Sequence, residues 1–142
     1  MNGREESTAD LLGAAARALR HRYLALMAPY ELTPGKARAL RAIVQAPGLR
    51  LSAVADQLGI VPRSATEVVD ALEARGLVRR APDADDRRAV VVAPTEEGIA
   101  LHEQLNAARV AEADAYLSVL AEPDRAELGR LLARLLAANR PG

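Results

Sequence analysis

The sequence predicts a mostly α-helical protein with a small two-stranded β wing, in which a winged helix-turn-helix is flanked by N- and C-terminal dimerisation helices. Two observations support this prediction. Residues 52–58 and 62–75 have the apolar spacing of two short helices separated by a tight turn. Two β-branched segments then enclose a Pro- and Asp-rich loop, which is typical of a charged hairpin. Because this is the layout of a winged DNA reader, we expect the chain to bind DNA.

Composition alone is neutral on this point. The chain has 142 residues, half of them apolar, which suits one globular domain, and its 19 basic and 19 acidic residues cancel. Their distribution is uneven: residues 33–65 carry five basic and one acidic group, a net +4, whereas residues 95–142 carry five basic and eight acidic groups, a net −3. This pattern favours a basic DNA-binding face at the centre over ordinary surface variation.

Several other classes of protein are disfavoured. The N-terminus is polar, and no apolar run approaches 18–20 residues. We therefore expect no export signal and no membrane anchor, and we expect the protein to be cytoplasmic. The absence of cysteine removes disulfides and thiolate zinc sites. With two distant histidines, no phosphate-binding glycine loop and no metal-ligand spacing, the chain is expected to be no enzyme and to need no cofactor or metal.

The N-terminal half reads as two helices. Apolar residues recur every three or four positions over 7–28, with Ser7 or Thr8 available as the N-cap. The segment 29–32 breaks this helix. Thr33 and Pro34 are a cap and a first-turn proline that start a second helix, which Pro47-Gly48 ends.

The predicted helix-turn-helix follows. Ser52 is the expected N-cap of a short helix with Val54, Ala55 and Leu58 in the core, and Gly59 permits the turn. In the next helix, 62–75, the core stripe is Ala65, Val68, Val69 and Leu72. The opposite face, which we expect to meet the major groove, holds Arg63, Thr66, Glu67 and Asp70.

The remainder reads as a wing and two helices. Segments 77–80 and 89–93 form the predicted strands. Thr95 is the expected N-cap of a helix that runs to about Leu120. A new helix follows Pro123, over residues 125–138, with its leucines on one face. We divide the chain into an N-terminal dimerisation helix (1–32), the winged domain (33–94) and C-terminal dimerisation helices (95–142).

The outer helices have more apolar positions than a winged domain can cover. A homodimer would bury them and place two recognition helices about 34 Å apart on a palindrome. The alternative is that they pack within one chain.

The motifs resemble those of the MarR family of dimeric transcription regulators. The similar segments are Leu51-Ser52-x-Val54-Ala55-x-x-Leu58-Gly59, Ser64-x-Thr66-x-x-Val69-Asp70-x-Leu72-Glu73-x-x-Gly76-Leu77-Val78, Asp86-Arg87-Arg88 and Thr95-x-x-Gly98. The Asp-Arg-Arg wing followed by Thr-x-x-Gly is the more specific part. The helix-turn-helix is shared by many regulators.

The resemblance implies a set of DNA-binding residues. Arg88 would enter the minor groove, held by a charge-assisted hydrogen bond that its guanidinium donates to Asp86. Arg79, Arg80 and Arg87 would contact phosphates or point to water, and Lys36, Arg38 and Arg41 would contact the backbone. The full DNA-binding set is Lys36, Arg38, Ser52, Arg63, Ser64, Thr66, Glu67, Arg79, Asp86, Arg87 and Arg88.

Three positions depart from the family pattern. Val61 replaces a hydroxyl cap, so we expect the recognition helix to start without a side-chain cap unless Ser64 provides one. Pro94 replaces a leucine before the Thr-x-x-Gly motif. Glu67 replaces an arginine that is common at this position. Its carboxylate would accept a hydrogen bond from cytosine N4 or form an ion pair with Arg63. These differences bear on the operator sequence more than on the fold.

Family membership would also imply a ligand-responsive repressor, released from a pseudo-palindromic operator by a small aromatic or phenolic effector. Candidate ligand-binding residues are Arg17, His21, Tyr23, Tyr30 and, in addition, His102. For either histidine, an exposed or satisfied structural role is commoner than ligand binding. The competing function is a winged helix that contacts only proteins, because Glu67, Asp70 and the acidic wing loop would repel DNA.

Overall fold

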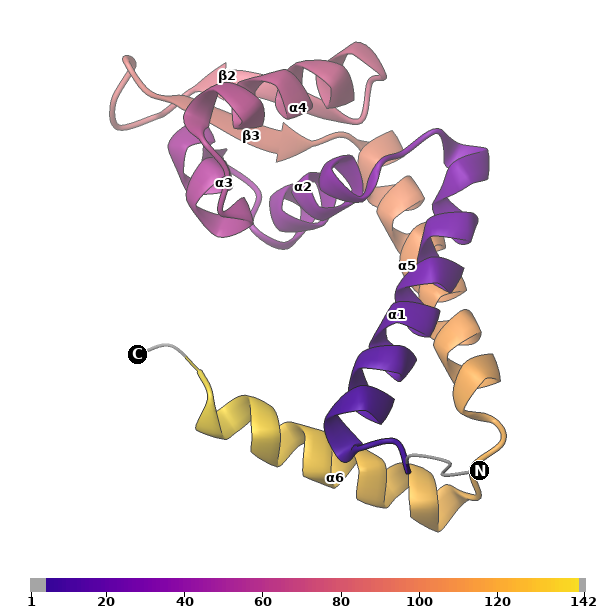
Figure 1. Cartoon of the computed structure of the whole chain (residues 1–142). Helices are drawn as coiled ribbons and strands as arrows, with labels where there is room; N and C mark the ends of the chain where they lie inside the picture. Colours follow the sequence, from indigo (N-terminus) through magenta and orange to yellow (C-terminus); the bar gives the residue numbers. More distant parts are fainter. Residues whose placement is uncertain (1–4, 141–142) are drawn as a thin grey trace.

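The computed structural model describes residues 5–140, in which a winged domain sits at one end of a helical stalk (Figure 1). The elements in order are α1 (Thr8–Met27), η1 (Ala28–Tyr30), α2 (Pro34–Gln45), β1 (Leu49–Arg50), α3 (Leu51–Leu58), α4 (Pro62–Ala74), β2 (Val78–Pro82), β3 (Val90–Pro94), α5 (Glu96–Leu117) and α6 (Glu122–Ala138). Helices α1 and α5 run side by side as the stalk, and α6 crosses its far end. The predicted fold class is confirmed.

The core lies mainly within the winged domain, and Leu101 and Leu105 of α5 pack against it. Its largest fully buried side chains come from α2, α3, α4 and the sheet: Leu40, Ile43, Leu72, Val54, Val69, Val78 and Val92. Each contributes roughly 1.5–3 kcal/mol through burial. By contrast, neither α1 nor α6 contains a buried residue. The apolar stripe predicted for the last helix therefore remains uncovered within one chain.

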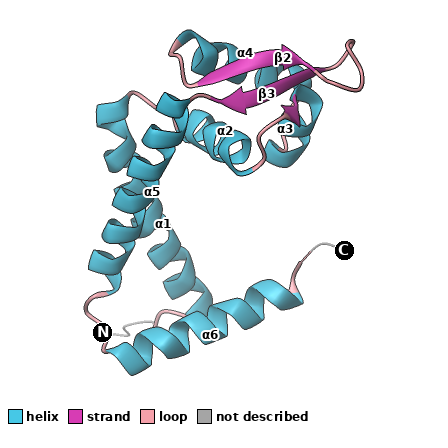
Figure 2. Cartoon of the chain, turned by 180° about the vertical axis from the view of Figure 1, so that it is seen from behind, coloured by secondary structure: helices cyan, strands magenta, loops and turns pink. Residues whose placement is uncertain are grey.

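The sheet has three antiparallel strands in the order β1-β3-β2, so the prediction of two strands was incomplete (Figure 2). Strand β2 pairs with β3 from Val78 opposite Pro94 to Pro82 opposite Val90. The additional strand, β1, has two residues, and Arg50 pairs with Val91. Two residues are too few to show the alternation that identifies a strand, and only their tertiary pairing defines them.

Three of the predicted helix caps are confirmed. Ser7 forms a capping box with Asp10, and the side chain of Thr33 accepts from the backbone N–H of Lys36. Thr95 accepts from the N–H of Gly98 in the same way. Each cap satisfies a backbone donor that the helix itself leaves free, which is why these starts are readable from local sequence.

Other predicted boundaries were wrong. Ser52 is not the N-cap of α3: the cap is Arg50, without a side-chain cap, because its backbone is extended by pairing in the sheet. Helix α5 ends at Leu117, and α6 begins at Glu122, since proline is tolerated in a first turn. By contrast, the expectation that α4 lacks a side-chain cap is confirmed: its N-cap is Val61, and Ser64 does not provide a cap.

Candidate nucleic-acid interface

Helix α4 and the wing lie at the end of the molecule farthest from α6 (Figures 1 and 2). The outward face of α4 carries Arg63, whose side chain is 92% exposed, and Glu67 one turn later. Their charged groups are 3.9 Å apart. An exposed pair of this kind is worth at most about 1 kcal/mol, so the Arg63 guanidinium is free to exchange Glu67 for another anion.

The hydroxyl residues of α4 are less exposed than its charged residues. Thr66 is partly buried, and its hydroxyl donates to the carbonyl of Pro62 at 3.1 Å. Ser64 is also partly buried. The hydroxyl of Thr66 retains its acceptor lone pairs, which face the same side of α4 as Arg63. This face therefore offers one mobile cation and a hydroxyl acceptor.

The wing loop, residues 83–89, exposes Arg87 and Arg88. The Asp86 carboxylate accepts from the backbone N–H of Arg88 at 3.0 Å. The expected contact between the Asp86 carboxylate and the Arg88 guanidinium is absent from the described residues, because an aspartate two positions earlier reaches the backbone in a local turn. Asp86 therefore shapes the loop and leaves the Arg88 side chain available.

Arg80 is occupied by carboxylates, unlike its neighbour Arg79. Its guanidinium donates to Asp70 and, at 3.0 Å, to Glu73, both on α4. Its backbone N–H donates to Glu73 as well, at 3.0 Å. Only 24% of the Arg80 side chain is exposed, whereas Arg79 is an exposed residue of the same strand. Arg80 was expected to contact phosphate or to point into water, and it does neither. Its side chain links β2 to α4 and neutralises Asp70.

We expect Arg80→Ala to lower the free energy of unfolding by about 2 kcal/mol, because it removes charge-assisted hydrogen bonds and leaves two carboxylates facing each other. Arg79→Ala is the matched control on the same strand, with an expected change within about 0.5 kcal/mol. Urea denaturation of both variants measures the difference. Equal midpoints would show that the Arg80 cluster contributes nothing to stability.

The predicted backbone-contact residues of α2 and α3 are dispersed. Lys36 is partly buried, and Ser52 is exposed at the second position of α3. Arg38 donates to the carbonyl of Leu58 at 3.3 Å and also lines a pocket, together with Arg41. Two of the three basic residues of α2, Arg38 and Arg41, thus line a pocket that α2 shares with the stalk helices.

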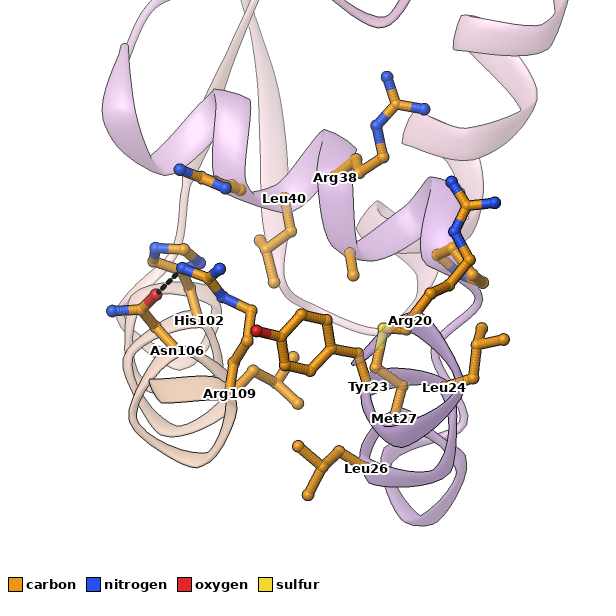
Figure 3. Close-up of a pocket in the computed structure, with 14 residues that line it drawn as sticks. Arg20, Tyr23, Leu24, Leu26, Met27, Arg38, Leu40, His102, Asn106 and Arg109 are labelled. Carbon is orange, nitrogen blue, oxygen red and sulfur yellow. Dashed lines mark hydrogen bonds between the residues drawn. The ribbon is translucent and has the colours of Figure 1, made fainter. Parts of the chain in front are cut away.

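That pocket, of about 540 Å³, lies where α1, α2 and α5 converge (Figure 3). Tyr23 extends from α1 toward Arg109 of α5, whose guanidinium carbon lies 5.8 Å from the ring centre. Arg109 also donates to Asn106 at 3.1 Å. The basic residues in the lining are Arg20, Arg38, Arg41, His102 and Arg109. An apolar-walled cavity lined by four arginines is suited to an organic anion.

The structure places two of the five candidate ligand residues in the pocket. Tyr23 and His102 line it, while Arg17, His21 and Tyr30 are outside its lining; Tyr30 packs against the core. The pKa of His102 is held below its ordinary value by partial burial and by the neighbouring charges of Arg41 and Arg109. The imidazole is therefore neutral near pH 7.

Sequence reasoning missed Arg20, Asn106 and Arg109 as pocket residues. Arg20 and Arg109 are almost ninety positions apart in the sequence, and they line the same pocket because α1 packs on α5. Nothing local marks them, since an arginine on an amphipathic helix is ordinarily solvated. Among residues 5–140, no cluster of His, Asp and Glu could hold a metal ion. No helix described is long and apolar enough to cross a membrane.

Comparison with known proteins points to one family. The MarR family model matches residues 32–90. The chain is 29% identical over 107 residues to the HTH-type transcriptional repressor MdtR of Bacillus subtilis strain 168, covering 75% of this chain and 69% of the relative.

Two solved structures are similar across nearly the whole chain. The Mycobacterium tuberculosis MarR family protein Rv2887, in complex with DNA, has a TM-score of 0.78 and 27% identity, covering 92% of this chain and 98% of that one. The PcaV transcriptional regulator of Streptomyces coelicolor, in complex with its natural ligand, has a TM-score of 0.66 and 27% identity, covering 96% and 99%.

Proposed function

We propose that this chain is a transcription regulator of the MarR family, a ligand-responsive repressor that binds a pseudo-palindromic operator as a homodimer. One observation supports the proposal most directly. Uncommitted cations occur on two neighbouring elements, Arg63 on α4 and Arg88 in the wing. Their spacing on a helix and an adjoining hairpin suits simultaneous contact with a major groove and the next minor groove.

We assign the DNA contacts as follows. Arg63, Ser64 and Thr66 contact bases or phosphates from α4, with Glu67 adjusting the position of Arg63. Arg88 enters the minor groove, where its narrow walls concentrate negative potential. Phosphate contacts come from Arg79 and Arg87, with Lys36, Arg38 and Ser52 at the margin, and Asp86 shapes the loop.

The homodimer is supported by the uncovered outer helices. Leu11 and Leu12 of α1 are 52% and 47% exposed, and Leu131 and Leu135 of α6 are 42% and 52% exposed. Apolar side chains exposed along two helices are better buried by a second copy, at roughly 25 cal/mol per Å². A two-fold dimer then presents two recognition helices to two half-sites.

The effector is proposed to be an organic anion bound in the α1–α2–α5 pocket. Four arginines supply the charge complement, and Tyr23 supplies an aromatic wall. The PcaV structure, which holds that regulator's natural ligand, makes small-molecule control a reasonable expectation for a relative. Because the pocket adjoins both the stalk and α2, an occupant would change the angle between winged domains. The protein would act in the cytoplasm, on the chromosome.

The protein-interaction alternative rested on exposed acids near the DNA face. Asp70 is paired with Arg80, and Asp83 with Arg50. These pairs neutralise two of the carboxylates that would repel DNA, so we favour the DNA-binding function.

Fluorescence anisotropy against a pool of duplexes, with salt varied, tests the proposal. We expect selective nanomolar binding that weakens steeply with salt, because phosphate contacts release counterions. Arg88→Ala should weaken binding about tenfold or more and lower the salt slope by about one. Arg134→Ala on α6 is the control that removes the same charge far from the winged domain. No binding to any duplex, even at low salt, would favour the protein-interaction function.

A further inference from the structure

The wing loop is attached to the rest of the domain by a single side-chain pair. Among the hydrogen bonds and ion pairs of residues 5–140, the contact between Arg50 and Asp83 alone joins residues 83–89 to another element. The remaining contacts of this loop are internal to the hairpin. A loop that projects as far as this one, seen in Figures 1 and 2, would otherwise pivot on its two strands.

The geometry of the pair is favourable. Both Nε and an η nitrogen of Arg50 lie 2.8 Å from Oδ2 of Asp83. The other carboxylate oxygen, Oδ1, accepts from the backbone N–H of Asp85 at 2.9 Å. Only 15% of the Asp83 side chain is exposed. The hydrogen bond from Asp85 and the guanidinium of Arg50 lower the pKa of Asp83, so the pair stays ionised at physiological pH.

Arg50 itself is held from both sides. Its backbone pairs with Val91 of β3 and is the N-cap of α3. The guanidinium therefore starts from a rigid point beside the helix-turn-helix, and it fixes the base of the wing relative to that motif.

The constraint extends from Asp83 to Arg88 through the backbone. The N–H of Asp83 donates to the carbonyl of Ala89, and the N–H of Ala89 donates to the carbonyl of Asp86, each at 3.0 Å. Asp86 in turn accepts from the N–H of Arg88. Four consecutive hydrogen bonds, starting at the Arg50 side chain, thus determine where Arg88 leaves the loop.

We propose that Arg50 and Asp83 are positioning residues for DNA binding, which hold the wing in the orientation that presents Arg88 to the minor groove. This inference rests on the proposed DNA-binding function. It predicts an effect opposite in sign to simple electrostatics. Removing the negative charge of Asp83 from a DNA-facing loop should tighten binding if charge alone matters. If the carboxylate positions the wing, its removal weakens binding.

The test compares Asp83→Asn with Asp85→Asn, which removes the same charge two residues away. The Asp85 side chain makes no hydrogen bond or ion pair among the described contacts. We expect Asp83→Asn to weaken duplex binding about fivefold at constant salt with an unchanged salt slope, and Asp85→Asn to leave it equal or tighter. In a double-mutant cycle, Arg50→Gln should cost little more in the Asp83→Asn background. Tighter binding by Asp83→Asn, or fully additive losses, would overturn the proposal.

A second readout does not depend on DNA. In the free protein, the amide hydrogens of Arg88 and Ala89 should exchange several-fold faster in Asp83→Asn than in Asp85→Asn, with thermal midpoints of the two variants alike. Equal exchange would overturn the positioning role. If exchange differs but the unmodified protein binds no duplex, the DNA-binding function itself fails, and the role of the pair in DNA recognition fails with it.

Discussion

Gly98→Ala is expected to destabilise the folded chain by about 3 kcal/mol, because no space exists for even one methyl group. A Cβ at this position would lie 2.0 Å from the carbonyl oxygen of Leu77 and 2.9 Å from its carbonyl carbon. The obstacle is backbone, which cannot rotate away as a side chain would. The same carbonyl accepts from the N–H of Thr95 at 3.0 Å, and the Thr95 hydroxyl donates to Gly76 at 2.6 Å. The first turn of α5 therefore packs directly against the backbone at the start of β2.

Gly129→Ala in α6 is the matched control. It is also a helical glycine, and a Cβ there meets no atom within 4 Å. Alanine should stabilise that helix by about 0.5–1 kcal/mol through its better helix propensity. Chemical denaturation of both variants measures the contrast. A Gly98→Ala protein as stable as the unmodified chain would mean that α5 can move away from Leu77 at no cost.

Leu135→Glu is expected to convert the proposed homodimer into a monomer and to lower operator affinity about a hundredfold. Leu135 is 52% exposed on α6, in the stripe with Leu128, Leu131 and Leu132. In a two-fold dimer each substitution occurs twice, so two charges would be buried without partners. The loss of affinity follows because two linked half-sites bind far more tightly than either one.

Ala133→Glu adds the same charge to the opposite face of α6, where Ala133 is exposed. This control should remain dimeric. Light scattering after size exclusion gives the molecular mass of each variant, and anisotropy gives the affinity. If Leu135→Glu remained dimeric with full affinity, α6 would not form the interface, and the exposed leucines would need another explanation.

Much of the fold could be predicted because its signals are local. The caps at Ser7, Thr33 and Thr95 each involve groups three residues apart, and Gly59 and Gly76 adopt the positive φ that ends a helix. Apolar periodicity identified the core positions of α4, where Ala65, Val69 and Leu72 are buried. Strand β1 and the true start of α3 were missed, because both depend on pairing with a segment some forty residues away.

The assignment of charges to roles was less predictable. From sequence, Arg79, Arg80 and Arg87 were equivalent, and Asp83 counted against DNA binding. The structure differentiates them: Arg80 is held by Asp70 and Glu73, and Asp83 by Arg50. Long flexible side chains select partners by proximity in space, which composition and spacing do not encode.

The sequence by itself determined the helices, the turns and the hairpin, because hydrophobic period, caps and turn signals act over a few residues. The tertiary structure alone decided which arginines are free and which are paired. It also decided that Tyr23, His102 and Arg109 share one pocket and that α6 leaves its leucines uncovered. These features arise from contacts between different elements, seven positions apart for Arg80 and Glu73 and almost ninety for Tyr23 and Arg109. Such contacts exist only once the elements have packed.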